Sequence, residues 1–208
     1  RFGKDNPDLR FGMELKDISD LAAGSGFKVF ESAVTNGGLV RGINAKGCGE
    51  YTRKQIDELT EFVKQFGAKG LAYLAISENG EYRSPFIKFL PENVLNVILE
   101  RLEGSAGDLL LFVADQPAIV CEALGRLRVQ LAERLSLADP DTLAFCWVVD
   151  FPFVNWSEDE KRWDPSHHLF TSPMKEDIPL LNSDPGKARG QQYDMVLNNY
   201  EVGGGSIR

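Results

Sequence analysis

The sequence contains no long apolar run and few of the residues that build disulfide or metal sites. None of its apolar stretches approaches the roughly 20 residues of a membrane-spanning helix, and its first residues lack an apolar signal core. The three cysteines are odd in number, lie far apart and lack metal-ligand spacing: Cys48, Cys121 and Cys146. These absences predict a soluble, cytoplasmic protein with reduced, structural thiols and no membrane partner.

A surplus of basic residues is also missing. The 208 residues include 23 Lys and Arg against 31 Asp and Glu, a formal net charge of −8. Binding to phosphate backbones needs clustered Lys and Arg, so DNA is not expected as a partner and any contact with RNA must be local. The hydrophobic content of 43% is that of an ordinary globular protein with a buried core, in one domain or two.

The middle of the chain has the pattern of an α+β module. Short runs rich in Val, Ile, Phe and Leu predict strands at residues 27–32, 39–45, 71–77, 84–90 and 108–115. Apolar stripes and end signals predict helices at 52–66, with Thr52 as N-cap and Gln55 three residues on, at 91–102, opening at Pro91, and at 117–135. We therefore predict the α+β class, with a mainly antiparallel sheet and flanking helices.

Apolar and polar segments alternate after this module. Residues 143–154, L-A-F-C-W-V-V-D-F-P-F-V, predict a strand buried on both faces, and the charged residues 157–162 predict a hairpin tip. The segment H-H-L-F-T-S-P at 167–173 holds the only two histidines; adjacent strand residues point to opposite faces, so one histidine is expected to be structural. Residues 175–192 are polar and punctuated by proline and glycine, which predicts a mobile loop.

The last stretch, Q-Q-Y-D-M-V-L-N-N-Y-E-V-G-G-G-S-I-R, predicts a β-hairpin. Asparagine tolerates the positive φ of a tight two-residue turn, so Asn198 and Asn199 form the predicted turn. This register places Asp194, Glu201 and Gly203 on one face. Two carboxylates side by side are destabilising unless a cation lies between them, which indicates a divalent metal or a basic ligand.

A bulge is predicted in the glycine run of this hairpin. Glu201 and Arg208 lie an odd number of positions apart, so a regular strand would turn them to opposite faces. The run Gly203–Gly205 weakens a strand, and such glycines usually mark a bulge or a close approach of a ligand to the backbone. A bulge there would bring Glu201 and Arg208 to one pocket.

The two ends of the chain resemble one family of enzymes. R-F-G-K-D-N-P-D-L-R-F-G at residues 1–12 is similar to the segment after the second class motif of bacterial-type aspartyl-tRNA synthetases, which are class II enzymes, although Phe2, Lys4 and Asn6 differ from the usual residues. The final hairpin resembles the strand pair before the third motif, with Asn199 in place of glycine.

Two interior segments carry the same resemblance. T-R-K-Q-I-D-E at 52–58 and G-A-K-G-L-A-Y at 67–73 are similar to the domain inserted between the two motifs, the GAD domain, which also occurs in a subunit of tRNA-dependent amidotransferases. H-H-L-F-T-S-P resembles the family's H-H-P-F-T-S-P, with Leu169 in place of proline. The resemblance thus covers nearly the whole chain.

The resemblance implies binding roles, and it implies no catalytic residue within this chain. The position of Glu201 holds ATP, partly through Mg, and that of Asp194 supports the same metal. The position of Arg208 receives the side-chain carboxylate of L-aspartate, a task that suits the planar guanidinium fork. His167 belongs to the aspartate pocket, and His168 is a second candidate for it.

The resemblance also implies a domain division and an activity. Residues 1–16 and 126–208 are expected in a discontinuous antiparallel catalytic sheet, and 17–125 in the inserted GAD domain. The family activates aspartate with ATP to aspartyl-adenylate, transfers it to the 3′ end of tRNA, and forms homodimers. Both class motifs lie outside the chain, so we expect a fragment of an aspartate–tRNA ligase that is inactive alone.

An alternative is a tRNA-binding or interaction module like the amidotransferase domain. This alternative explains only residues 17–125 and leaves the hairpin and the histidine pair without a role. Lys54, Lys64 and Lys69 could contact tRNA, and a solvated helix face explains these lysines equally.

Overall fold

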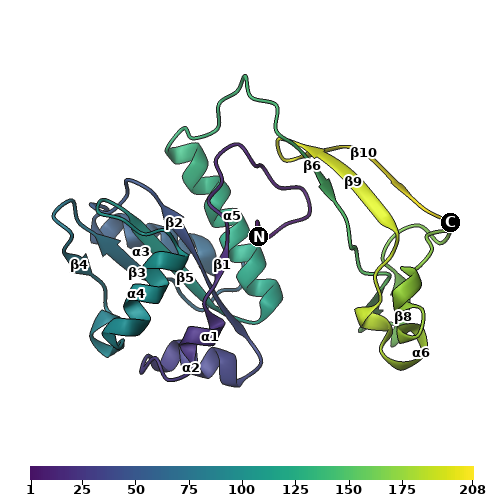
Figure 1. Cartoon of the computed structure of the whole chain (residues 1–208), viewed down its shortest axis with the longest axis horizontal. Helices are drawn as coiled ribbons and strands as arrows, with labels where there is room; N and C mark the ends of the chain where they lie inside the picture. The colour runs from purple at the N-terminus through teal and green to yellow at the C-terminus, as the bar shows by residue number, and fades with distance from the viewer. The chain divides into compact units, whose positions relative to one another are not determined.

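The computed structural model describes residues 1–208, and the chain forms two compact units. The first unit comprises residues 1–4 and 11–139, and the second comprises residues 5–10 and 140–208 (Figure 1). Both units combine helices with antiparallel strands, which confirms the predicted α+β class. The predicted domain boundaries at residues 16 and 125 stay a prediction. The compact units divide at other positions, since the helix that begins at residue 117 packs entirely in the first unit.

One five-stranded antiparallel sheet organises the first unit, in the order β1-β2-β5-β3-β4. Its strands are β1 (Lys16–Asp17), β2 (Leu39–Ala45), β3 (Ala72–Ile76), β4 (Tyr82–Arg83) and β5 (Leu109–Asp115). The central strand β5 pairs with β2 along its whole length and with β3 through Ala72 opposite Phe112. The sequence predictions for residues 39–45, 71–77 and 108–115 are thereby confirmed.

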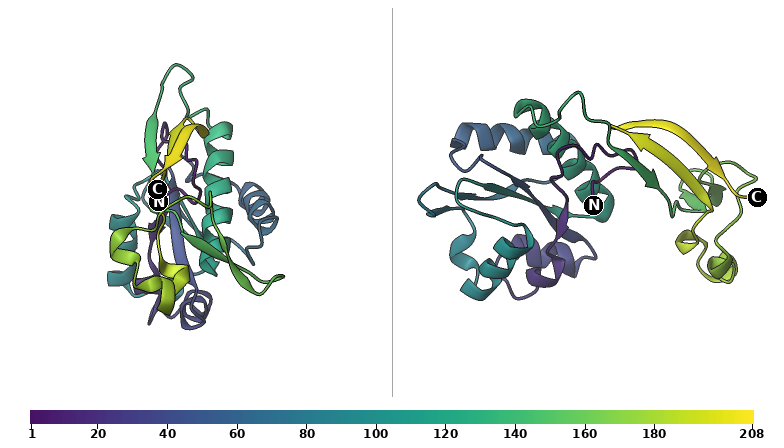
Figure 2. Two further views of the ribbon diagram at one scale, coloured as in Figure 1. Left: turned by 90° about the vertical axis from the view of Figure 1, so that its right-hand side faces the viewer. Right: turned by 45° about the horizontal axis from the view of Figure 1, so that its top comes forward.

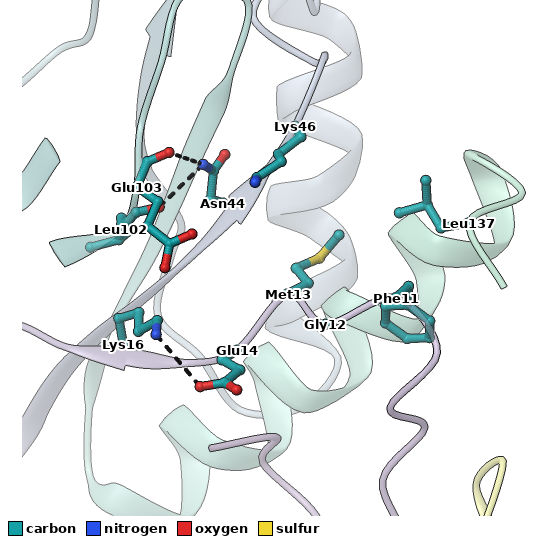
Figure 3. A pocket seen from close by; sticks show the side chains of 10 residues that line it. All are labelled: Phe11, Gly12, Met13, Glu14, Lys16, Asn44, Lys46, Leu102, Glu103 and Leu137. Atoms are coloured by element: carbon teal, nitrogen blue, oxygen red, sulfur yellow. Dashed lines mark hydrogen bonds and ion pairs between the residues drawn. The ribbon is translucent and has the colours of Figure 1, made fainter. Parts of the chain in front are cut away.

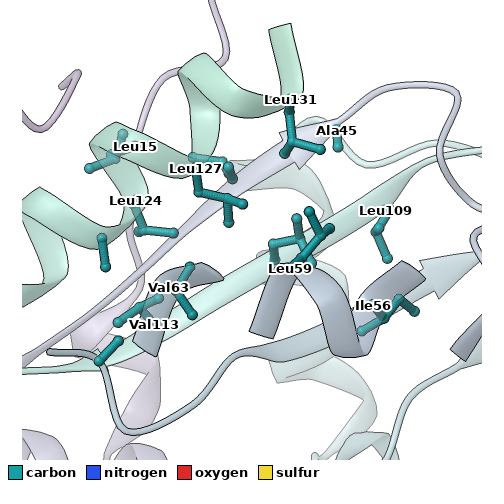
Figure 4. Packing of buried hydrophobic residues seen from close by; sticks show 14 of the residues in the cluster. Leu15, Ala45, Ile56, Leu59, Val63, Leu109, Val113, Leu124, Leu127 and Leu131 are labelled. Atoms are coloured by element: carbon teal, nitrogen blue, oxygen red, sulfur yellow. The ribbon is translucent and has the colours of Figure 1, made fainter. Parts of the chain in front are cut away.

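Helices cover both faces of this sheet (Figure 2). One face packs against α3 (Arg53–Lys64) and α5 (Pro117–Arg134), and the other against α1 (Ser19–Ala22), α2 (Lys28–Thr35) and α4 (Glu92–Arg101). Successive residues of β5 point to opposite faces, so each core receives alternate side chains of this strand. Figure 4 shows the first core, in which Leu59, Leu109 and Leu127 are fully buried.

The three predicted helices of this unit are confirmed, and local signals explain where they start. Thr52 and Gln55 form a capping box: Thr52 Oγ1 accepts from the Gln55 backbone N–H at 3.4 Å, and Gln55 Oε1 accepts from the Thr52 backbone N–H at 2.9 Å. Pro91 is the N-cap of α4, and Pro117 opens α5, where a missing N–H costs little.

Two predicted strands of the first unit are wrong. Residues 27–32 fall largely in α2, because Phe27 and Phe30 share one helix face and stack edge to face at 4.9 Å between ring centroids. A short apolar run does not separate a buried helix from a strand. Residues 84–90 contain the 3₁₀ helix η1 (Ile87–Phe89), and the only strand nearby is β4. There Phe86 enters the second core from an irregular segment.

The second unit contains two small antiparallel sheets. The first has the order β10-β9-β6 and the second pairs β7 with β8; the strands are β6 (Phe145–Val148), β7 (Val154–Ser157), β8 (Arg162–Pro165), β9 (Gln192–Leu197) and β10 (Tyr200–Ser206). The β7–β8 pair, with Trp156 opposite Trp163, confirms the predicted hairpin tip.

The prediction of a strand buried on both faces at residues 143–154 is wrong. The stretch contains the four-residue strand Phe145–Val148 and the first residue of β7, and Phe145 and Trp147 are 54% and 61% exposed. The apolar run therefore presents one open face within this chain.

The polar segment 175–192 is more ordered than predicted. It forms the turns η2 (Lys175–Asp177) and η3 (Pro185–Lys187) and the short helix α6 (Leu180–Ser183) before β9 begins. Proline and glycine punctuation indicated a loop, but it reports only where regular structure is interrupted. Ion pairs between residues far apart in sequence hold this segment, and no local pattern predicts them.

Candidate functional site

The β9–β10 hairpin carries both candidate carboxylates, and its turn is the one predicted. Asn198 and Asn199 have φ values of 48° and 77°, and Leu197 faces Tyr200 across the turn. The Asn198 side chain also anchors the hairpin, since its Oδ1 accepts from the Ala144 backbone N–H at 3.0 Å. The turn is therefore fixed by backbone conformation and by a side chain that tolerates it.

A bulge interrupts β10, as predicted from parity. Glu201 pairs with Val196 and Gly203 pairs with Met195, so the register shifts between Glu201 and Gly203. Asp194 consequently lies opposite Gly204. The prediction that Gly203 shares the face of the carboxylates is wrong, because the extra residue moves that position to Gly204.

The two carboxylates converge above Gly204. A methyl group built there would collide with Oδ1 of Asp194 and would lie 3.3 Å from Oε1 of Glu201. Both carboxylate oxygens therefore lie next to the position that a Cβ atom of residue 204 would occupy. Carboxylate oxygens are the donors that Mg takes in proteins, where it is usually held by one or two carboxylates together with substrate phosphates. No group of three or more His, Cys, Asp or Glu side chains forms a protein-only metal cluster.

All five predicted site residues line one cavity of about 440 Å³ in the second unit. Its lining includes His167, His168, Asp194, Glu201 and Arg208. The lining also includes Gly204 and Gly205 of the glycine run and three residues that the sequence analysis did not single out: Phe170, Gln192 and Ser206. The cavity therefore holds two carboxylates at one part of its lining, and a guanidinium and two imidazoles at others.

Neither histidine belongs to the hydrophobic core or to a strand, so the premise from which one was expected to be structural does not hold. Both are exposed and lie in an irregular segment, where strand alternation does not apply. The His167 ring packs edge to face on Phe151, with 4.7 Å between ring centroids. His168 Nδ1 accepts from the Phe170 backbone N–H at 3.3 Å, which leaves its Nε2 for another partner.

Arg208 is held by an aromatic contact and by the backbone of the residue before it. Its guanidinium carbon lies 4.8 Å from the centroid of the Phe170 ring, a cation–π contact. The preceding residue, Ile207, donates its N–H to Gln191 O at 2.9 Å and accepts from the Ser172 N–H at 2.8 Å. The aromatic residue of the H-H-L-F-T-S-P segment thus supports the arginine, and the sequence offered no signal for that contact beyond its place beside the histidines.

Another cavity of about 440 Å³ lies in the first unit (Figure 3). Its wall includes Asn44, whose Nδ2 donates to Leu102 O at 3.2 Å and Glu103 O at 3.0 Å, and the Lys16–Glu14 ion pair at 3.5 Å. None of the predicted site residues lines it. Its charged groups are already paired with one another or are of both signs, and no ligand chemistry follows from them.

Comparisons with known proteins relate the chain to one domain class and one group of proteins. Residues 30–124 match the GAD domain, so the first unit contains a domain of that class. Over its whole length the chain is 57% identical to the aspartate–tRNA(Asp/Asn) ligase of Symbiobacterium thermophilum, 53% to that of Geotalea uraniireducens and 52% to the aspartate–tRNA ligase of Ruminiclostridium cellulolyticum. It spans 36%, 35% and 35% of these relatives. The chain therefore corresponds to a segment, about a third in length, of the bacterial aspartate–tRNA ligases.

The helices add one finding on the membrane question. None of them combines the length and apolar character that crossing a bilayer requires.

Proposed function

We propose that the full-length protein containing this chain is an aspartate–tRNA ligase. It activates L-aspartate with ATP to aspartyl-adenylate and transfers the aspartyl group to the 3′ end of tRNA. The observation that carries the proposal is the single cavity lined by His167, His168, Asp194, Glu201 and Arg208. The names of the relatives support it, since each is an aspartate–tRNA ligase.

Arg208 and the histidines are proposed to bind aspartate. A guanidinium grips a carboxylate through two parallel hydrogen bonds, and the stacking on Phe170 limits the orientations that Arg208 adopts. A neutral imidazole donates or accepts a hydrogen bond near a bound carboxylate, and a protonated one attracts it. His167 is the principal candidate, because Phe151 fixes its ring, and His168 is the second.

Asp194 and Glu201 are proposed to hold ATP through Mg. Their convergence above Gly204 suits one cation, and the phosphates would complete its coordination. When bound, Mg neutralises phosphate charge and orients the nucleotide for attack at the α-phosphate. Glu201 would also contact ATP.

The remaining proposals concern the whole protein and the first unit. The full-length protein is proposed to act in the cytoplasm as a homodimer, and the 208 residues alone are proposed to be inactive. The GAD match favours a second role, tRNA binding or protein interaction, for residues 30–124 only.

Binding of a non-hydrolysable aspartyl-adenylate analogue tests the proposal. Calorimetry on the 208-residue chain should detect binding that Arg208→Ala weakens by at least about tenfold, the loss expected for a charge-assisted bidentate contact. Arg162→Ala is the matched control, because Arg162 is an exposed arginine of the same unit outside the cavity. Equal affinities for wild type and Arg208→Ala would overturn the assignment of the aspartate pocket. Aspartate-dependent pyrophosphate exchange by these residues would overturn their predicted inactivity.

A further inference from the structure

Arg189 forms the densest ion-pair cluster of the second unit, although no part of it lines the cavity. Its Nε lies 2.8 Å from Asp177 Oδ2 and its Nη2 lies 3.2 Å from Asp177 Oδ1, a bidentate pair. Nη1 donates to Asp150 Oδ1 at 3.3 Å, and Nη2 also donates to Glu176 Oε1 at 3.1 Å. One guanidinium thus joins three acidic residues from two segments of the chain.

The electrostatics of this cluster favour a permanent pair. Asp177 is only 7% exposed, and its Oδ2 also accepts from the Arg189 backbone N–H at 3.0 Å. The hydrogen bonds from Arg189 hold the pKa of Asp177 below its usual range, and the same contacts raise the pKa of Arg189. Both partners therefore stay charged over the working pH range of a protein.

Backbone hydrogen bonds extend the cluster in two directions. Arg189 O accepts from the Met174 N–H at 2.8 Å, and the Gly190 N–H donates to Phe151 O at 2.8 Å. Phe151 is the residue whose ring supports His167. Met174 directly follows the H-H-L-F-T-S-P segment, so Arg189 connects to both supports of the histidine wall.

The strand that begins just after Arg189 leads to the opposite part of the cavity. Gln191 donates its N–H to Ser172 O at 2.8 Å and accepts from the Ile207 N–H, next to Arg208. Arg189 therefore lies where the segment carrying the histidines meets the hairpin that carries the carboxylates and leads to Arg208.

We propose that Arg189 is a positioning residue that sets the distance between His167 and Arg208, and thereby the fit of aspartate. This inference rests on the proposed function. The carboxylate pair depends less on Arg189, because Asp194 and Glu201 belong to one hairpin whose ladder runs from Leu197 opposite Tyr200 to Gln192 opposite Ser206. Loss of the Arg189 side chain should thus weaken the binding of aspartate more than the binding of ATP.

The test is steady-state pyrophosphate exchange by the full-length ligase that contains this segment. Arg189→Gln should raise the KM for aspartate by about tenfold or more, since displacement of contacts by about 1 Å is sufficient for such a loss. The KM for ATP should change less than about twofold, because the hairpin is intact. Arg189→Lys keeps the charge but loses the fork, so its aspartate KM should fall between those of the wild type and Arg189→Gln.

Lys187→Gln is the matched control. Lys187 is an exposed residue of the same segment, and its ion pair is with Asp184 at 2.7 Å. The Lys187→Gln variant should therefore leave both KM values unchanged. Hydrogen exchange in the 208-residue chain gives an independent readout: Arg189→Gln should accelerate exchange at the amides of Gly190, Gln191 and Ser172, and Lys187→Gln should not.

Several outcomes would overturn the role of Arg189. A folded Arg189→Gln enzyme with an unchanged aspartate KM would do so, as would equal increases for aspartate and ATP. If Arg189→Gln does not fold, Asp150→Asn repeats the test, since it removes one contact and asparagine tolerates the φ of 61° at that position. An unchanged ratio of KM values in that variant would also overturn the role. A wild-type enzyme without aspartate-dependent exchange would instead overturn the proposed function itself.

Discussion

Two neighbouring glycines of β10 are expected to respond in opposite ways to the same substitution. A methyl group at Gly203 meets no atom within 4 Å, whereas one at Gly204 collides with Asp194 Oδ1 and crowds Glu201 Oε1 at 3.3 Å. Neither glycine has a positive φ, so alanine is compatible with both backbones. The substitutions therefore differ chiefly in what they do to the carboxylates.

The magnitudes follow from these contacts. Gly203→Ala should leave stability unchanged or raise it by up to about 1 kcal/mol, because alanine lowers the conformational entropy of the unfolded chain. Gly204→Ala forces a carboxylate at the end of a flexible side chain out of its rotamer, at about 0.5–1.5 kcal/mol. Its effect on ATP should be larger, since the two oxygens no longer approach one point: we expect MgATP affinity in the full-length ligase to fall by about tenfold or more.

Urea unfolding and MgATP titration of both variants provide the assay. The titration should be repeated with ATP in EDTA, where the difference between the variants should shrink because no cation bridges the carboxylates and the phosphates. Equal MgATP affinities of Gly203→Ala and Gly204→Ala would contradict a carboxylate pair that holds Mg. An equal loss of affinity by Gly204→Ala in EDTA and in Mg would contradict it too, because the loss would then not involve a metal.

Two further predictions concern stability. Leu127→Ala should destabilise the first unit by about 2–5 kcal/mol in urea unfolding, because Leu127 is fully buried between α5 and the sheet. Leu127 lies beyond the predicted domain boundary at residue 125. A loss of stability below about 1 kcal/mol would favour that boundary. Asp177 has a pKa held below its unfolded value by Arg189, so the stability that this pair contributes is present above the unfolded pKa of about 4 and is lost as the pH falls through the folded value. Urea midpoints of the wild type and Asp177→Asn should therefore converge in acid, and a constant difference from pH 7 to pH 3 would contradict this.

The sequence predicted those parts of the fold that local chemistry determines. The capping box at Thr52 and the asparagine turn at residues 198–199 are short-range signals, and both were found where expected. The bulge was predictable from the parity of Glu201 and Arg208, but its position relative to Gly203 and Gly204 was not, since one extra residue exchanges their faces. The strand predicted at residues 27–32 was wrong because Val and Phe in a short apolar run fit a helix or a strand equally.

The candidate site shows the same division. Each of the five predicted residues belongs to a short segment whose sequence resembles a family motif, so all five could be named from the sequence. The structure places them around one cavity. Arg189 was missed because its acidic partners are 12, 13 and 39 positions away, and nothing near it in sequence indicates a pair. Phe170 was missed as a support of Arg208 for a similar reason, since the contact joins segments that are distant in sequence.

The two halves of the cavity therefore depend on different kinds of structure. One hairpin positions Asp194 and Glu201, and the turn and the bulge of this hairpin arise from residues close together in the sequence. His167 and Arg208 are set by hydrogen bonds among Ser172, Gln191 and Ile207, which lie on three separate segments. Under the proposed function, substitutions remote from the cavity should disturb aspartate binding more readily than MgATP binding, because only the aspartate half requires separate segments to keep their distance.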